Sequence, residues 1–206
     1  MRKIRKFKVA IHLKEILRRI KLSGIDGNAA GFALDSDIAV FTAALHRAVE
    51  PGVVYELIEG RSMELAGVPH GDMSSVCAVT LGSKLEGEIA KISNPQALAI
   101  ANIIIYEFLR TAITFVANLV EEDAKKEDYT AEGWQILYSP SFGYGPEPKF
   151  LREAARIDTD SARKALGALL ERLNAGKIGV KFDGESVTPK ATVVFILPWQ
   201  RKKGKK

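Results

Sequence analysis

The stretch NPQALAIANIIIYEFLRTAITFVANLVEED, residues 94–123, has the longest helical apolar pattern in the chain. The pattern continues to about Val120, and Pro95 fits the first turn of a helix. A helix of this length can span a bilayer, but charges at mid-bilayer are costly. Asn102, Glu107, Arg110 and Asn118 lie inside the segment. We therefore expect a buried central helix and no membrane association.

Shorter strand and helix patterns are interspersed along the rest of the chain. Apolar alternation or short apolar runs predict strands over 7–12, 53–58, 75–82, 133–139, 177–182 and 192–197. Helical spacing predicts helices over 14–22, 35–50, 83–92, 148–157 and 161–174. Residues 61–73 fit one helical turn or two. Because strands and helices do not alternate strictly, we expect an α+β fold.

The net charge of +5 is concentrated at the two ends of the chain. Residues 1–21 carry nine Lys or Arg and one acidic residue, and residues 201–206, RKKGKK, carry five Lys or Arg. Residues 22–200 hold the remaining 16 basic and 24 acidic residues, a net charge of about −8. A nucleic-acid-binding protein usually spreads basic residues over a folded face. We therefore expect no nucleic-acid partner and interpret 201–206 as a disordered basic tail.

The composition is typical of a single globular domain in a reducing compartment. Of the 206 residues, 47% are hydrophobic and 27% charged. Without a repeat or a low-complexity linker, we expect one domain over 1–200 with an N-terminal helical extension over about 1–30. Cys77 is the single cysteine and cannot form an internal disulfide. No signal peptide is recognisable, so we expect a cytoplasmic protein.

Motifs for familiar catalytic chemistry are missing from the sequence. It contains no P-loop, no GxGxxG after a strand and no GxSxG. The three histidines have no Cys, Asp or Glu at metal-ligand spacing, so no metal site is expected. Cys77 is interpreted as a core thiol. Ser83 is interpreted as an ordinary helix cap, with anion binding at that helix start as the alternative.

Glu107 is the most interesting ionisable residue, because it follows three isoleucines and a tyrosine in the most apolar part of the central helix. A buried carboxylate needs a hydrogen-bonded or charged partner. One interpretation pairs it with Arg110 at i,i+3. The other points it into a pocket, where it would meet a cationic ligand.

Four features, in order along the chain, resemble one known family. They are Ala78-x-Thr80-Leu81-Gly82 before a helix, an acidic residue (Glu107) in a long apolar helix, Ser139-Pro140 with Gly143-Tyr144-Gly145, and a hairpin with Ile178-Gly179, Glu185-Ser186, Pro189 and Val193. Their order and spacing are similar to those of the vitamin B12-dependent methionine synthase activation domain, above all its small stand-alone members. The resemblance covers roughly residues 75–197, with a weaker match at HLKEILRRIKL, residues 12–22.

The resemblance implies a twisted, mainly antiparallel sheet flanked by helices. It implies binding of S-adenosylmethionine, which such domains present as methyl donor to a corrinoid (B12) held by a partner protein. The partner would be methionine synthase or another corrinoid-dependent methyltransferase, and a flavodoxin-like protein would supply the electron. The positions that the resemblance assigns to the ligand are Glu107, Pro140, Gly143, Tyr144 and Gly145.

The sequence departs from the family where the ligand carboxylate is expected. The family has an arginine shortly before Pro-Gly-Tyr, and a guanidinium can bind a carboxylate through two parallel hydrogen bonds. Here Ser141 and Phe142 are inserted, and the arginine position falls on Leu137 or Ser139, depending on the alignment. The aromatic residues that the family has near the end of the last strand correspond to Leu197 and Pro198.

Three functions are consistent with these features. The first is an accessory protein for the reductive reactivation of a corrinoid-dependent methyltransferase, with S-adenosylmethionine as methyl donor. The second is a binding module with the same fold and partner that no longer binds S-adenosylmethionine. The third is an unrelated α+β protein whose basic ends contact nucleic acid or an anionic membrane.

Overall fold

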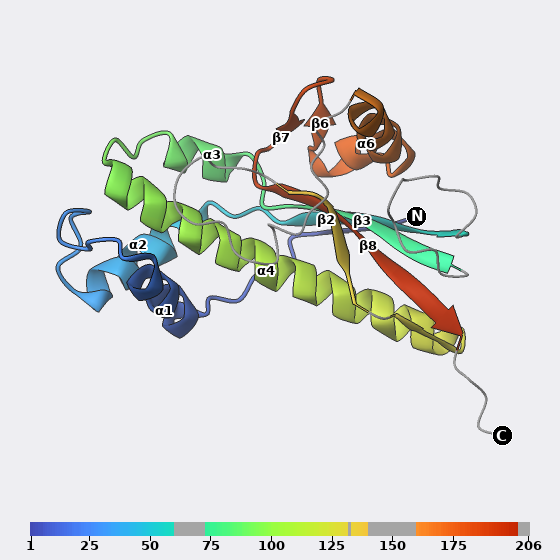
Figure 1. Ribbon diagram of the computed structural model, residues 1–206, viewed down its shortest axis with the longest axis horizontal. Coiled ribbons are helices and arrows are strands. Elements are labelled where there is room, and N and C mark those ends of the chain that lie inside the picture. Colours follow the sequence, from blue (N-terminus) through green and yellow to red (C-terminus); the bar gives the residue numbers. More distant parts are fainter. Residues whose placement is uncertain (60–72, 132, 140–159, 202–206) are drawn as a thin grey trace.

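A six-stranded antiparallel sheet forms the centre of the protein (Figure 1). The computed structural model describes residues 1–59, 73–131, 133–139 and 160–201, with 160–162 as backbone only. The strand order is β1-β2-β3-β8-β4, and β5 also pairs with β8. Their bounds are β1 Arg2–Arg5, β2 Gly52–Glu59, β3 Met73–Thr80, β4 Tyr129–Ala131, β5 Gln135–Tyr138 and β8 Thr192–Arg201.

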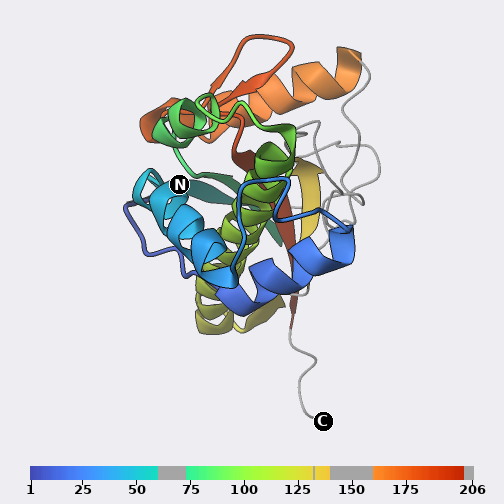
Figure 2. The ribbon, with the colours of Figure 1, turned by 90° about the vertical axis from the view of Figure 1, so that its left-hand side faces the viewer.

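Helices cover both faces of this sheet. They are α1 Leu13–Ser23, α2 Asp35–Arg47, α3 Lys84–Ile89, α4 Pro95–Lys126, α6 Asp160–Arg172 and the short 3-10 helix η2 Ala175–Ile178. A small hairpin, β6 Lys181–Phe182 with β7 Val187–Thr188, lies beside α6. Figure 2 shows α1 and α2 on the side of the sheet opposite to α6 and the hairpin. Mixed helices and an antiparallel sheet confirm the predicted α+β class.

Successive apolar side chains of the central strands point to opposite faces of the sheet and form two separate apolar cores. In β2, Val53 contributes to the core under α4, while its neighbour Val54 contributes to the core under α6. Cys77 and Val76 in β3 divide in the same way. Successive side chains of a strand point to opposite faces, so continuously apolar strands are explained by helices on both sides. Cys77 is fully buried, as predicted, and burial raises the pKa of its thiol.

Helix α4 crosses the first of these faces and is the predicted central helix. Its N-cap Asn94 accepts hydrogen bonds from the backbone N–H groups of Gln96 at 2.8 Å and Ala97 at 3.2 Å, and Pro95 follows the cap. Alone among the described helices, α4 is long and apolar enough to span a membrane. Its apolar side chains pack instead against the sheet, α1 and α2, and residues 100–109 are all buried.

The predicted strand over 7–12 is wrong, and the first strand lies earlier, at Arg2–Arg5. Phe7 and Val9 do alternate and are buried, but their partners are helical: the Phe7 ring stacks on Phe115 of α4 at 4.7 Å between centroids. The Val9 carbonyl lies 2.8 Å from Nε2 of His46 in α2. The alternation therefore reflects packing of an extended segment against helices.

The predicted strand over 177–182 is wrong for most of its length. Ile178 ends the 3-10 helix η2, and only Lys181–Phe182 is extended. Its partner is Val187–Thr188, inside the segment expected to be a plain connection. Asp183 closes this hairpin, because its carboxylate accepts the backbone N–H groups of Glu185 at 2.9 Å and Ser186 at 2.7 Å. Asp183-Gly184 thus forms the turn expected from its sequence.

The other predicted helices and strands agree with the structure where it describes them. The helices expected over 14–22 and 161–174 and the strands over 53–58, 75–82 and 192–197 are present within a few residues. Helix α2 begins at Asp35 with Leu34 as its N-cap residue, and the Asp37 carboxylate accepts the Leu34 N–H at 2.9 Å. The helix expected over 148–157 and most of the segment 61–73 lie outside the described residues.

We predict that Gly82→Ala destabilises the fold by about 1–3 kcal/mol. Gly82 has φ +88°, and a Cβ there would lie 2.8 Å from the Glu50 carbonyl oxygen. Gly87→Ala is the matched control, because Gly87 is helical and a Cβ there would meet no atom within 4 Å. It should be neutral or stabilising by about 0.5–1 kcal/mol. Urea unfolding measures both, and equal effects would contradict the prediction.

Candidate functional site

Two of the four segments that carry the family resemblance, the one ending at Gly82 and the one containing Gly179 and Pro189, meet at one end of the sheet. The end of β3 lies beside the start of β8, where Thr80 pairs with Thr192. The Thr192 hydroxyl lies 3.1 Å from the Thr80 hydroxyl and donates to the Pro189 carbonyl at 2.6 Å. Thr80 in turn accepts the Gly82 N–H at 3.1 Å. These buried hydroxyls therefore tie the loop after β3 to the loop before β8.

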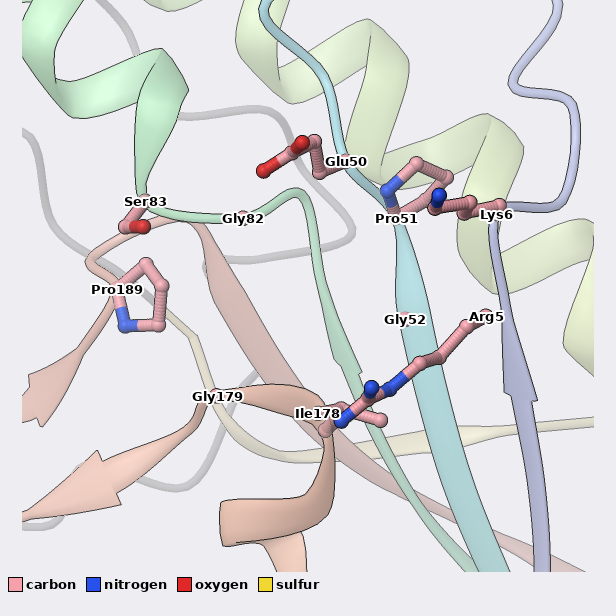
Figure 3. Close-up of a pocket in the computed structure, with 10 residues that line it drawn as sticks. All are labelled: Arg5, Lys6, Glu50, Pro51, Gly52, Gly82, Ser83, Ile178, Gly179 and Pro189. Atoms are coloured by element: carbon pink, nitrogen blue, oxygen red, sulfur yellow. The ribbon is translucent and has the colours of Figure 1, made fainter.

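A pocket of about 280 Å³ opens beside this junction (Figure 3). The residues that line it are Arg5, Lys6, Glu50, Pro51, Gly52, Gly82, Ser83, Ile178, Gly179 and Pro189. Gly52 packs closely here, because a Cβ at this position would lie 3.0 Å from the Cβ of Ile178, which would have to shift. Ser83 occupies the N-cap position of α3, yet its hydroxyl makes no capping hydrogen bond, so the predicted cap role is wrong.

A second pocket, of about 420 Å³, lies between β1, β2 and the end of α4. One of its lining residues is Asp123, which was not singled out from the sequence. Its Oδ2 accepts from Arg2 Nη1 at 2.6 Å and from the Tyr55 hydroxyl at 3.0 Å, and its Oδ1 accepts from Lys126 at 3.2 Å. The Asp123 carboxylate is thus satisfied by donors of the chain itself.

Glu107 is fully buried and forms an ion pair, which confirms the pairing interpretation. Arg110 Nε donates to Glu107 Oε2 at 3.0 Å, and Arg110 Nη2 donates to Oε1. A second cation, Arg19 of α1, has its Nε 3.6 Å from Glu107 Oε2. Neither of the two pockets described above is lined by Glu107. A role of Glu107 toward a cationic ligand stays a prediction, but its charge is already compensated.

Arg19 belongs to a wider cluster that links α1 to α4. Glu15 accepts two hydrogen bonds from Arg18, each at 2.7 Å, and one from Arg19 at 2.8 Å. These guanidinium groups, Arg18 first, lower the pKa of Glu15 from 4.5 to about 2. The i,i+3 and i,i+4 spacing within α1 could have predicted these pairs. The contact of Arg19 with Glu107 has no sequence signal, because it depends on how α1 packs on α4.

In the described residues, the segment leading into the predicted ligand loop supplies no basic side chain for the carboxylate of the ligand. Leu137, one of the two positions aligned with the family arginine, is buried in the core under α6. Ser139, the other, is half-buried and carries no charge. Pro140, Gly143, Tyr144 and Gly145 lie outside the described residues.

No protein-family model matches the chain, and no curated protein matches its sequence. The resemblance to the activation domain therefore depends on the residues and on their arrangement alone.

Glu107→Gln should destabilise the protein by roughly 1–3 kcal/mol, because it leaves Arg110 and Arg19 without the carboxylate they share. The loss is smaller than for a fully buried pair, since the Arg110 side chain is 36% exposed. Glu121→Gln is the control, because it removes a surface pair with Lys125 on the same helix and should cost at most about 0.5 kcal/mol. Denaturant unfolding measures both. Equal costs would contradict a structural role for the Glu107 pair.

The contribution of Glu15 to stability should depend on pH. Its folded-state pKa lies below the unfolded value, so the contribution is complete above pH 4.5 and is lost as pH falls toward about 2. The stability difference between the wild type and Glu15→Gln should therefore shrink over this window. Denaturant unfolding of both proteins from about pH 6 to about pH 3 measures it. A difference that stays constant would contradict the ion-pair geometry.

Proposed function

We propose that this protein is an accessory factor for the reductive reactivation of a corrinoid-dependent methyltransferase, with S-adenosylmethionine as methyl donor. The observation that carries the proposal is the convergence of the family-like segments. Gly82, Gly179 and Pro189 are far apart in the sequence but line one pocket. The hydrogen bonds among Thr80, Thr192 and Pro189 hold these segments together. The proximity of these two of the four family-like segments supports the proposal.

The protein's own contribution in this function is binding and orientation. The corrinoid is held by the partner and supplies the metal chemistry, as cofactors generally do. The chain would hold S-adenosylmethionine through the loop that contains Gly143, Tyr144 and Gly145. Glycines there allow close approach of the backbone to a ligand, and a tyrosine ring can stack on the adenine.

A second candidate function is favoured by the charges around Glu107. S-adenosylmethionine has a carboxylate and two positive groups, so it needs both a cation and an anion from the protein. The Glu107 carboxylate is bound by Arg110, and neither Leu137 nor Ser139 is basic. A binding module that docks onto the same corrinoid protein without S-adenosylmethionine agrees with these two observations.

Titration calorimetry with S-adenosylmethionine separates the two candidates. The first candidate predicts saturable binding heat with the wild-type protein. In Tyr144→Ala the affinity for S-adenosylmethionine should fall by about tenfold or more, or binding should be lost. Tyr129→Phe is the control, because it keeps an aromatic ring on Trp199 and lies outside the loop. Absence of heat at millimolar ligand would end the first candidate and leave the second.

The docking step common to both candidates is tested separately. The immobilised protein should retain a purified corrinoid-dependent methyltransferase in its cob(II)alamin form, and should not retain a methyltransferase that lacks a corrinoid. If neither methionine synthase nor another corrinoid methyltransferase is retained, both candidates fail.

A further inference from the structure

The pocket at the end of the sheet has an excess of positive charge. Arg5 and Lys6 line it, and within the part of the chain that the structure describes neither forms an ion pair. Glu50 is the single acidic residue of the lining, and its carboxylate is bound by Lys84 at 2.7 Å. The pocket therefore offers two uncompensated cations to whatever enters it.

Further positive charge lies beside the pocket. Lys3 precedes Arg5 on β1, and Lys177 belongs to η2, the element that also contributes Ile178 to the lining. Loss of hydration and the neighbouring charges of Arg5 and Lys177 lower the pKa of Lys3. Like charges brought together by folding repel one another, so an anion bound between them would relieve the repulsion.

Lys6 has a backbone conformation that a lysine rarely adopts. Its φ is +58°, and the other described non-glycine residues with positive φ are Asp128 and Asn174. Asp and Asn tolerate this left-handed region comparatively well, whereas lysine does not. The Lys6 N–H donates to the Pro51 carbonyl at 2.9 Å, which holds the turn in place. Lys6 is therefore a strained residue at the rim of the pocket, and backbone strain of this kind clusters at functional sites.

The remaining lining combines one side-chain donor, Ser83, with glycines and a few apolar residues. Figure 3 shows the Arg5 side chain reaching across Gly52 toward Ile178. The Ser83 hydroxyl is exposed and makes no capping bond. Gly52, Gly82 and Gly179 line the pocket without side chains. At about 280 Å³ the space is near the lower end of the range for small-molecule sites, roughly 300–1,000 Å³.

We propose that this pocket binds a small phosphate-bearing anion, held by Arg5 and Lys6 with the Ser83 hydroxyl as an additional donor. A guanidinium and an ammonium together match the oxygens of a phosphate or diphosphate group. The proposal goes beyond the proposed function, because it uses none of the residues assigned to S-adenosylmethionine. Since the pocket is open to solvent, binding should weaken as ionic strength rises.

Calorimetry with inorganic pyrophosphate and with inorganic phosphate at low ionic strength tests the proposal on the full chain. The wild type should bind pyrophosphate saturably and more tightly than phosphate. The double variant Arg5→Gln/Lys6→Asn should weaken pyrophosphate binding by about tenfold or more. Asparagine is chosen at Lys6 because it tolerates positive φ, so the fold should be kept, and thermal unfolding followed by circular dichroism checks this.

Lys8→Gln/Lys14→Gln is the matched control, because both lysines are exposed and lie outside the pocket, and their removal changes the net charge equally. The pyrophosphate affinity of this control should stay within about twofold of that of the wild type. Absence of saturable binding at millimolar pyrophosphate, or equal weakening by the two double variants, would overturn the proposal. Calorimetry with S-adenosylmethionine on Arg5→Gln/Lys6→Asn keeps the two proposals apart, since its binding should be unchanged.

Discussion

The burial of α4 is the constraint on which the rest of the structure depends. Residues 100–109 form an unbroken buried run, and each large apolar side chain contributes about 1.5–3 kcal/mol only when it is covered. The sheet covers one side of the helix, and α1 and α2 pack against another. A carboxylate within such a run must be neutralised. Arg110 supplies one cation from the same helix, and α1 brings a second, Arg19.

Coverage on both faces also limits where this protein can bind a partner or a ligand. Within the described residues, the central strands are mostly buried on both faces, with the core under α4 on one side and the core under α6 on the other. The edge strand β1 is exposed along most of its length. Basic side chains on an edge strand protect it from pairing with another chain. Arg5 of this strand also lines a pocket. The basic residues of β1 can therefore both protect the edge and bind a ligand.

Apolar periodicity in the sequence correctly predicted the elements whose spacing of apolar residues is the same whatever they pack against. The leucine face at Leu166, Leu169, Leu170 and Leu173 is helical wherever it packs, and these four side chains form part of the core under α6. The failures are elements that depend on distant partners. Strand β1 is polar and has no period, and it is a strand because Arg2–Arg5 pairs with residues 52–55. Phe7 alternates with Val9 but packs on helices.

The candidate sites show the same contrast between local contacts, which the sequence predicts, and distant contacts, which it does not. The sequence predicted a partner for Glu107 in Arg110, because i,i+3 spacing on a helix is a local property. It contained no sign that Arg19 completes the pair or that Arg5, Gly82 and Ile178 line one pocket. By itself the sequence determined the helices, the central strands and a buried carboxylate, since these depend on neighbours within a few residues. Only the tertiary structure decided which charges meet, because the packing of α1 on α4 and of β1 on β2 brings together residues distant in the chain.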